Sequence, residues 1–455
     1  MQATTKDAYR LMHNGAIAFS QMEANGIRID VDLLEKTTKN VARKIRSIQV
    51  ELEEDDLWKQ WKKTYKSKAN MGSRYQMADM LNKVHGFTKS NQDPDKKLSV
   101  DEKALLELDI PFIKKYLRME KLKKLHGTYL KGIHKEICDG LLHPSFNLHL
   151  VKTYRSSSDK PNFQNIPIRD PKIGKLIRSC FIPRPGRVLA EIDFGSLEVR
   201  IASCYHKDPV MLEYIRDPSK DMHRDMAMEC FMLPQEEITK EIRFYAKNQF
   251  VFPSFYGSYY GLMAPDLWDS VTKTKLITTS GVRLRDHLKK KGITRLGEKK
   301  DPRPRTFMHH IREVEENLWK KRFPIYDKWR WDWWKDYQER GWFNTLTGFR
   351  ELGVYAKNDV INHPVQCVAF HCLLWSLIEV QRWLNKSDKK TLLVGQIHDS
   401  IIADVPENEL EEYISHVLEV TTVDLPQHWK WIIVPLEVEV ETSRTNWWEK
   451  QKVKT

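Results

Sequence analysis

V-L-A-E-I-D-F-G-S-L-E-V-R (residues 188–200) and V-G-Q-I-H-D-S-I-I (residues 394–402) are the two stretches that decide the fold of this chain. Each places an aspartate, Asp193 in the first and Asp399 in the second, at or near the end of an apolar run that is typical of a buried strand. Because buried carboxylates are unfavourable unless cations pair with them, a metal role is favoured over that of two separate turn residues. If the fold brings the two runs together, their carboxylates can hold a pair of magnesium ions for in-line phosphoryl transfer.

The order of strands and helices predicts an α+β fold. Apolar runs at residues 186–193, 392–404 and 433–441 predict strands, and the second of these runs predicts a hairpin. Helical patterns fill residues 33–129 and 205–350. A sheet built from discontinuous segments, with helical blocks inserted between them, is the architecture that this order implies.

Composition favours a polyanionic partner and a reducing compartment. The 455 residues carry a formal net charge of +13, which attracts nucleic acid, although charge alone also fits an unspecialised basic protein. The six cysteines form no C-x-x-C pair, as expected of structural thiols. We find no apolar run long enough to cross a bilayer and no signal peptide, so we expect a cytoplasmic protein without membrane contact.

A basic and aromatic stretch lies between the two acidic ones. In R-F-Y-A-K-N-Q-F-V-F-P-S-F-Y-G (residues 243–257), Arg243 and Lys247 are one helical turn apart and share a face. Two cations alone would predict a solvated helix face, and core packing explains Phe250 and Phe255. Cations followed by aromatic rings also suit a triphosphate and a stacked base.

Two polar stretches and one histidine are candidates for DNA contacts. T-Y-R-S-S-S-D-K-P-N-F-Q-N-I-P-I-R-D (residues 153–170) is dense in side chains that can bond phosphate, sugar and minor-groove atoms, although a polar loop with an N-cap explains it as well. I-N-H-P-V-Q-C-V-A-F-H (residues 361–371) predicts the start of a helix, in which capping accounts for Asn362. His398 either caps a turn or contacts a primer terminus.

Taken together, these segments resemble the family A DNA polymerases, the DNA polymerase I class, over essentially the whole chain. Residues 153–167 are similar to the family's T-G-R-L-S-S-x-x-P-N-L-Q-N-I-P, and D-F-G-S-L-E-V-R (residues 193–200) is similar to its motif A, D-Y-S-Q-I-E-L-R. Residues 243–257 resemble motif B, and Q-I-H-D-S (residues 396–400) resembles motif C. Four motifs in register, with the helix at residues 361–371, are a highly specific signal.

The resemblance implies a right-hand polymerase fold, in which a palm with an antiparallel sheet carries helical fingers and a helical thumb. A basic, proline-punctuated stretch near residues 270–310 resembles the enlarged fingers of viral members, either as an insertion or as a long loop, so we expect a bacteriophage origin. The implied division is 1–32 (N-terminal part of the palm), 33–130 (thumb), 131–204 (palm), 205–350 (fingers with the basic insertion) and 351–455 (palm).

The resemblance assigns the metal chemistry to a few residues. Asp193, Asp399 and the backbone carbonyl of Phe194 would hold two Mg²⁺ ions, for which Mn²⁺ is a substitute. One ion would activate the primer 3′-hydroxyl, and the other would hold the triphosphate and the leaving pyrophosphate. Lys247 would act as a general acid toward the pyrophosphate.

The resemblance also assigns the substrate contacts. Phe252 would stack on the incoming base, Tyr256 would lie beside the templating position, and Glu198 would be the sugar gate that meets a ribose 2′-hydroxyl. The implied phosphate contacts are Arg243, Lys247 and His223, and the implied primer-template contacts are Arg155, Asn162, Gln164, Asn165, Asn362, Gln366 and His398.

The chain departs from the family pattern in three of these motifs. Motif A carries Gly195 and Ser196 where the family has a small polar residue and Gln. Ser400 follows the motif C aspartate where the family usually has a second acid, so catalysis must rest on the two aspartates alone. Motif B is one residue longer than usual between Lys247 and Tyr256. The normal distance to Tyr256 selects Phe252, rather than Val251, as the residue that faces the nucleotide.

We therefore expect a monomeric DNA-directed DNA polymerase that extends a primer with dNTPs in phage DNA replication, in the host cytoplasm. Expected partners are primer-template DNA, dNTPs, and a separate exonuclease or processivity factor. The upstream carboxylates of a proofreading exonuclease are not found in this chain, which leaves three alternatives: the natural protein has no exonuclease, a separate chain supplies it, or the sequence is part of a longer protein. A single-subunit RNA polymerase shares the palm chemistry, but Glu198 and the thumb-like opening argue against it. A non-catalytic DNA-binding hand would not need both aspartates, and a two-metal nuclease would need further carboxylates.

Overall fold

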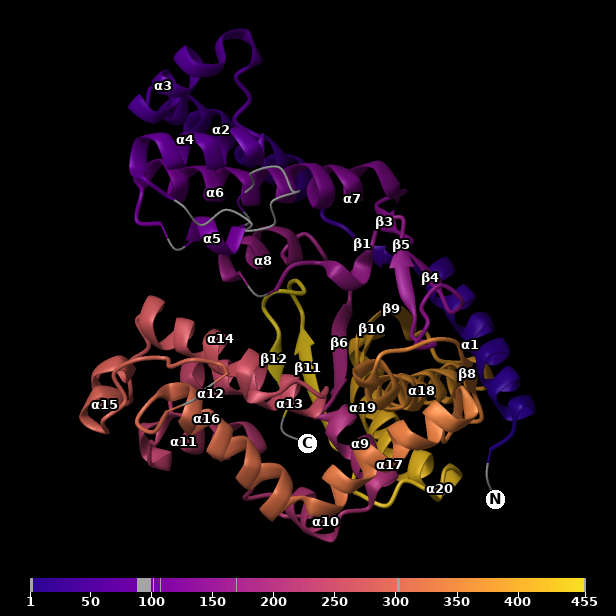
Figure 1. Ribbon diagram of the computed structural model, residues 1–455. Helices are drawn as coiled ribbons and strands as arrows, with labels where there is room; N and C mark the ends of the chain where they lie inside the picture. The colour runs from indigo at the N-terminus through magenta and orange to yellow at the C-terminus, as the bar shows by residue number, and fades with distance from the viewer. Residues whose placement is uncertain are drawn as a thin grey trace.

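The computed structural model has a central antiparallel sheet from which two helical arms extend (Figure 1). The sheet and its supporting helices come from both ends and the middle of the chain, and each arm is one continuous insertion between them. This arrangement confirms the predicted α+β class. Parts of the predicted thumb (88–99, 101 and 107) and of the predicted insertion (301–302) lie outside the described residues, which are 3–87, 100, 102–106, 108–168, 170–300 and 303–453.

The central sheet has five strands in the order β12–β11–β6–β10–β9, and every neighbouring pair is antiparallel. β6 lies in the middle of the sheet, and its neighbouring residues Val188 and Leu189, which point to opposite faces, are both buried. β11 begins later than the strand predicted at 433–441, since Pro435 has no amide hydrogen to donate to a ladder. The strands are β6 (Arg187–Phe194), β9 (Leu392–Ile397), β10 (Ser400–Pro406), β11 (Val438–Ser443) and β12 (Gln451–Lys452).

A long apolar helix, α18 (Lys357–Lys386), lies beside the sheet and packs against α1 (Thr5–Asn25), where Gly15 faces Leu374 with no room for a Cβ atom. By length and composition α18 could cross a membrane, which corrects the expectation that no apolar run is long enough. Most of it (78% of its apolar window) is nevertheless buried inside the protein, as in the core helix of a folded domain.

The first arm is the predicted thumb, drawn in indigo to purple in Figure 1. Asp30 caps its long first helix, α2, by accepting a hydrogen bond from the Leu33 amide (2.9 Å). Leu34, Val41 and Ile48 recur at seven-residue intervals on α2, so they form one buried stripe, and α2 packs against α6. The arm comprises α2 (Val31–Glu53), α3 (Asp56–Tyr65), η1 (Lys66–Lys68), α4 (Arg74–His85), α5 (Glu102–Leu106), α6 (Pro111–Lys124), η2 (Leu125–Leu130) and α7 (Lys131–Glu136).

The second arm is the predicted fingers. Its basic stretch is not one long loop, because Leu284 and Leu288 are fully buried one helical turn apart and form the inner face of α15. The arm comprises α10 (Pro209–Arg216), α11 (Met222–Phe231), η4 (Gln235–Glu237), α12 (Lys240–Ala246), η5 (Lys247–Val251), α13 (Phe252–Phe255), α14 (Tyr260–Lys273), α15 (Leu284–Lys290), α16 (Phe307–Glu316), η6 (Asn317–Arg322) and α17 (Pro324–Arg340).

Short strands and helices complete the region around the main sheet. β1, β3 and β2 form a small sheet at the base of the first arm, and β4–β5 and β7–β8 are separate two-stranded pairs. These elements are β1 (Ile27–Arg28), β2 (Ile137–Cys138), β3 (Leu141–Leu142), β4 (Ser145–Asn147), β5 (Ser157–Asp159), η3 (Phe163–Asn165), α8 (Pro171–Arg178), α9 (Leu197–His206), β7 (Trp342–Asn344), β8 (Arg350–Leu352), η7 (Glu407–Glu409), α19 (Leu410–Glu419), η8 (Val420–Asp424) and α20 (Leu425–His428).

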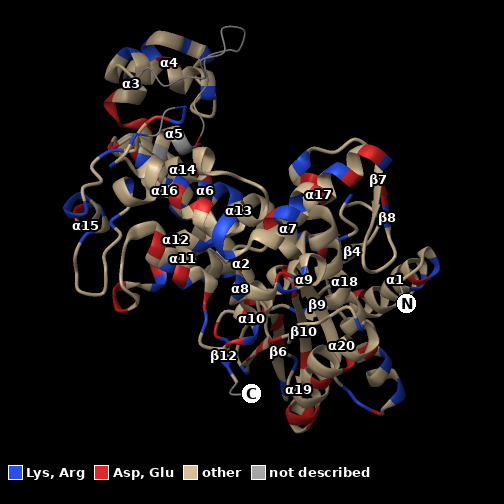
Figure 2. Cartoon of the chain, turned by 60° about the horizontal axis from the view of Figure 1, so that its bottom comes forward, with Lys and Arg blue, Asp and Glu red and all other residues tan. Residues whose placement is uncertain are grey.

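Charged side chains are spread over both arms. Figure 2 shows Lys and Arg on α3, α4, α15 and α17, with acidic side chains among them. On α6, Lys123 pairs with Glu120 (3.0 Å), whereas Lys121 and Lys124 border a cavity of about 540 Å³ between the first arm and the sheet. The net positive charge of the chain therefore includes lysines that face the space between the arm and the sheet.

Candidate active site

The two aspartates of the sequence hypothesis lie at one end of the central sheet. Asp193 is near the end of β6, and Asp399 is in the tight turn between β9 and β10, where His398 has a φ of 48°. Ser400 pairs with Asp193 in the antiparallel register, and the Phe194 amide donates to the Asp399 carbonyl oxygen (3.2 Å). The fold therefore brings together two side chains that are far apart in sequence.

Both aspartates border a cavity of about 310 Å³ between the sheet and the second arm. The cavity also receives side chains from α9, from the 153–170 stretch and from the helical segment that carries motif B. The predicted site residues that line it are Gln164, Asp193, Phe194, Glu198, Lys247, Phe252, His398 and Asp399.

The electrostatics of this cavity favour a cation next to the aspartates. By accessible surface Asp193 is exposed and Asp399 half-buried, which corrects the expectation that both carboxylates are buried. Desolvation by the surrounding protein and the neighbouring Asp399 carboxylate nevertheless raise the pKa of Asp193 to about 7, and desolvation raises the pKa of Asp399 to about 6. Such shifts mean that the two negative charges are incompletely compensated by the protein. Carboxylate and carbonyl oxygens are the donors that Mg²⁺ prefers, so Asp193, Asp399 and the Phe194 carbonyl fit that ion chemically.

The segment that carries motif B contains one extra residue, and a π-helical turn absorbs it. Residues Lys247–Val251 form η5, between the α-helices α12 and α13. As a result, Val251 is buried in the core and Phe252 faces the cavity, the arrangement that the distance to Tyr256 predicted. The Lys247 ammonium lies 5.1 Å from the centre of the Phe252 ring, and burial together with Arg243 lowers the pKa of Lys247.

Arg243, on α12, and His223, on the neighbouring helix α11, are not among the residues that line this cavity. The Arg243 guanidinium forms a two-pronged ion pair with Asp221, with Nε–Oδ2 and Nη2–Oδ1 distances of 2.7 and 3.1 Å. His223 packs edge-on against Phe252 at 5.6 Å, and burial, Lys247 and Arg243 lower its pKa to about 4, so the ring is neutral at pH 7. A phosphate at Arg243 would therefore replace the Asp221 carboxylate.

Glu198 is fixed by two hydrogen-bond donors from different parts of the chain. Its carboxylate accepts from the Arg155 guanidinium and from the Tyr256 hydroxyl, and burial and Glu198 raise the pKa of that tyrosine. Arg155 Nε also donates to the Gln366 carbonyl oxygen (3.3 Å). Four predicted contact residues from four sequence stretches thus meet at one point, on the α9 side of the cavity.

Asn362 does not cap a helix, which corrects the expectation for that residue. α18 already begins at Lys357, where the Ala356 amide donates to Asp359 (3.3 Å). Asn362 lies inside the helix, and its Nδ2 donates to the Tyr256 carbonyl oxygen (3.1 Å). It therefore ties α18 to the end of the motif B segment.

The remaining predicted primer-template residues lie between the sheet and the first arm. Gln164 Nε2 donates to Gln396 Oε1 (2.6 Å), and Gln396 Nε2 donates to the His398 carbonyl oxygen (2.6 Å), so the turn of Asp399 is braced by this chain of amides. Asn162 accepts from the Asn165 amide (3.1 Å) and caps η3, as the N-cap alternative predicted. Asn165 and His398 border the 540 Å³ cavity that Lys121 and Lys124 also line.

Sequence reasoning missed two charged residues of the site. Arg178 lies 3.9 Å above the Trp447 ring, lines the cavity, and has a pKa lowered to about 10 by burial. Glu191 also lines the cavity; burial alone would raise its pKa, but Lys450 keeps the pKa below its ordinary value and the carboxylate ionised. Glu191 could have been found as the one charge inside the apolar run V-L-A-E-I, whereas Arg178 has no comparable signal.

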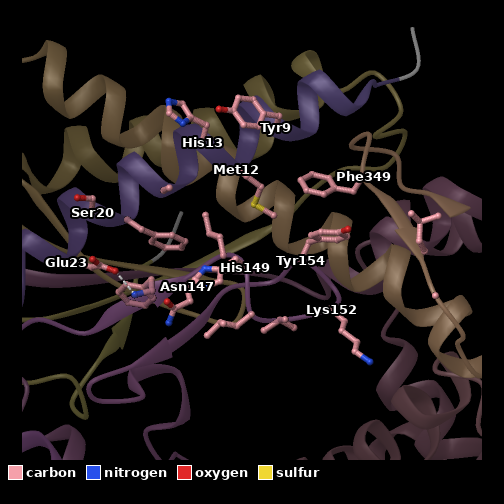
Figure 3. A pocket seen from close by; sticks show the side chains of 18 of the residues that line it. Tyr9, Met12, His13, Ser20, Glu23, Asn147, His149, Lys152, Tyr154 and Phe349 are labelled. Atoms are coloured by element: carbon pink, nitrogen blue, oxygen red, sulfur yellow. Dashed lines mark hydrogen bonds between the residues drawn. The ribbon is translucent and has the colours of Figure 1, made fainter. Parts of the chain in front are cut away.

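A larger cavity, of about 920 Å³, lies away from the aspartates along α1 (Figure 3). Aromatic and aliphatic side chains such as Met12, Tyr154 and Phe349 line most of it. Its carboxylate, Glu23, accepts a hydrogen bond from the Phe146 amide (2.5 Å). Size alone therefore does not identify the site, and the paired aspartates of the smaller cavity do.

Comparison with known proteins gives one consistent family. Residues 35–279 and 338–449 match the family model of DNA polymerase family A. The DNA polymerase of Bacillus phage SP01 is 25% identical over 425 residues, which cover 87% of this chain and 42% of that protein. DNA polymerase I of Aquifex aeolicus (strain VF5) is 29% identical over 438 residues, which cover 95% of this chain and 65% of that protein.

A solved structure has the same fold. The POL domain of Pol1 from M. smegmatis, in complex with DNA primer-template and dNTP, aligns with a TM-score of 0.74 at 21% identity, over 96% of this chain and 70% of that one. The predicted right-hand fold is thereby confirmed. The match to the family model skips residues 280–337, which overlap the predicted basic insertion, and the chain spans less than two thirds of the length of the two relatives.

Proposed function

Because the chain belongs to DNA polymerase family A, we propose that it is a DNA-directed DNA polymerase that extends a primer along a template with dNTPs. The observation that carries this proposal is the meeting of Asp193 and Asp399 in a cavity that also contains Lys247 and Phe252. The primer-template and dNTP in the M. smegmatis complex agree with the proposed substrates.

In the proposed mechanism, Asp193, Asp399 and the Phe194 carbonyl would hold two Mg²⁺ ions, which supply charge stabilisation for in-line phosphoryl transfer. Lys247 lies beside Phe252, and its lowered pKa favours release of a proton to the leaving pyrophosphate. The Phe252 ring would stack on the incoming base. Mn²⁺ is the proposed substitute for Mg²⁺.

The DNA would lie between the two arms, against the sheet. Lys121 and Lys124 on α6 are suited to the phosphate backbone, and Asn165 and His398 to the primer end. Arg155, Asn362 and Gln366 are proposed to face the minor groove, where every correct pair offers similar acceptors. Arg243 would release Asp221 to bind the triphosphate, and neutral His223 would donate a hydrogen bond to it.

The wider role that we propose is phage DNA replication in a bacterial cytoplasm. The phage SP01 relative supports this role, and so does the basic insertion of the fingers. The proposed polymerase acts as a monomer on DNA, with an exonuclease or a processivity factor as a separate partner.

Primer extension tests the proposal directly. We expect extension with dNTPs and Mg²⁺, and a loss on the order of 1,000-fold in Asp399→Asn, because metal-stabilised charge is worth several kcal/mol in the transition state. Asp388→Asn is the matched control, since Asp388 is exposed and pairs only locally with Lys390. Equal rates for Asp399→Asn and the control would refute the two-metal assignment, and preferential use of ribonucleotides would favour the RNA polymerase alternative.

A further inference from the structure

Ser400 stands where the family usually has a second acid, and its side chain bonds to a carboxylate on the adjacent strand. Ser400 Oγ donates to Glu191 Oε1 (3.2 Å). Ser400 pairs with Asp193 across β6 and β10, and Glu191 precedes Asp193 by two residues on β6. Because residues two apart in a strand point to the same face, the three side chains form one patch at the edge of the cavity.

The other oxygen of Glu191 is held by the C-terminal segment. Glu191 Oε2 accepts from Trp447 Nε1 (2.7 Å) and from Lys450 Nζ (2.5 Å), and Lys450 also pairs with Glu441 (2.7 Å). These contacts fix the rotamer of Glu191, so that Oε1 is the oxygen that meets Ser400. A buried carboxylate in the middle of an apolar strand is unfavourable unless such partners hold it.

We propose that Glu191 takes the role of the second acid that the family usually has at the position of Ser400. Glu191 lies on β6, the strand next to β10, and supports cation binding by Asp193 and Asp399. This inference rests on the proposed function. Among the described residues no three acidic, His or Cys side chains are grouped closely enough to hold an ion together, so Glu191 is a positioning residue rather than a direct ligand. It acts through its hydrogen bond to Ser400, which follows Asp399 directly, and through a negative charge near Asp193 that Lys450 partly offsets.

The alternative is a purely structural ion pair between Glu191 and Lys450. Glu441 provides the matched control, because it is the second carboxylate partner of the same ammonium but does not border the cavity. A structural ion pair predicts that Glu191→Gln and Glu441→Gln lower the melting temperature similarly and leave cation binding alone. The proposal predicts that only Glu191→Gln weakens cation binding.

The test measures Mn²⁺ affinity by electron paramagnetic resonance, with the full chain bound to a dideoxy-terminated primer-template and the matching dNTP, so that no turnover is needed. Glu191→Gln should weaken Mn²⁺ binding about 10-fold, as for other groups that orient metal ligands, and Glu441→Gln should leave it unchanged. The double variant Glu191→Ala/Ser400→Glu, which returns the acid to the usual family position, should recover most of the affinity. Melting temperatures of all variants identify any that fail to fold.

The possible results distinguish the proposal for Glu191 from the proposed polymerase function. Folded Glu191→Gln with wild-type Mn²⁺ affinity overturns the proposal, as does an equal loss in Glu441→Gln. If Glu191→Gln does not fold, Ser400→Ala takes its place. It removes the hydrogen bond to Glu191 Oε1 together with the one to the Ile397 carbonyl oxygen (3.0 Å), and affinity that is unchanged in this variant also overturns the proposal. Failure of the wild type to extend a primer would instead refute the proposed polymerase function, because the Mn²⁺ measurement does not depend on extension.

Discussion

The carboxylates at the sheet edge and on the α9 side of the same cavity differ in their electrostatic surroundings and in their hydrogen-bond partners. Asp193 and Asp399 have raised pKa values, because the surrounding protein desolvates both and the Asp399 carboxylate also acts on Asp193. Glu198 is engaged by the Arg155 guanidinium and the Tyr256 hydroxyl. Carboxylates in one cavity can therefore differ in role. The pair at the sheet edge is suited to bind cations, whereas Glu198, whose oxygens already accept hydrogen bonds, is suited to shape the space around a substrate.

Lys247 lies between these two regions, and its replacement should have the largest effect after that of Asp399. Lys247→Met should lower the rate of primer extension about 100-fold or more, because it removes a proposed general acid while keeping a side chain of similar length. Single-turnover extension with saturating dNTP measures this loss. Lys240→Met, at an exposed residue of α12, the helix that immediately precedes Lys247, is the control and should extend at the wild-type rate. A Lys247→Met enzyme as fast as that control would remove Lys247 from the chemistry.

The sheet edge was the more predictable of the two regions. Apolar runs that end near an aspartate indicated the strands at 188–200 and 394–402, whereas the pairing of β6 with β10 was a condition of the hypothesis that the structure then met. The ends of the strands and helices were harder to predict from the sequence. β11 starts later than expected because of Pro435, and α18 starts before Asn362 because Asp359 caps it. Local hydrogen bonds, which the hydrophobic pattern does not contain, set these ends.

The α9 side depends on contacts that no local pattern encodes. Glu198, Arg155 and Tyr256 come from three separate segments, and only the resemblance to the family associated them before the structure did. Asp221 as the partner of Arg243, and Arg178 on the Trp447 ring, were not predicted at all, since each pairing is decided by tertiary packing. The extra residue of motif B was visible in the sequence, but its absorption in the π-helical turn η5 was not.

Glu198→Ala tests whether the satisfied carboxylate really differs in role from the pair at the sheet edge. Removing its bulk should make ribonucleotide incorporation about 10-fold more efficient relative to deoxynucleotides, since small steric differences in a pocket are worth about 1–3 kcal/mol. The Mg²⁺ concentration that gives half-maximal extension should stay at the wild-type value. Competition between dCTP and CTP measures the first effect, with Glu213→Ala on the exposed side of α10 as the control. If Glu198→Ala changes the Mg²⁺ concentration for half-maximal extension but not the discrimination between ribo- and deoxynucleotides, Glu198 acts in cation binding like the aspartates, and the proposed difference in role is refuted.

Phe252→Tyr tests the substrate-binding region of the cavity with a smaller expected effect. The phenol hydroxyl would add one hydrogen-bonding group next to the sugar, so dideoxynucleotides, which lack the 3′-hydroxyl, should be incorporated several-fold more readily, in line with about 1 kcal/mol for one hydrogen bond. Phe244→Tyr adds the same hydroxyl to an exposed ring of the same helical segment and should have no effect. Because the π-helical turn buries Val251 and directs Phe252 to the cavity, an unchanged ratio of dideoxy- to deoxynucleotide incorporation in Phe252→Tyr would mean that the ring leaves this position when DNA binds.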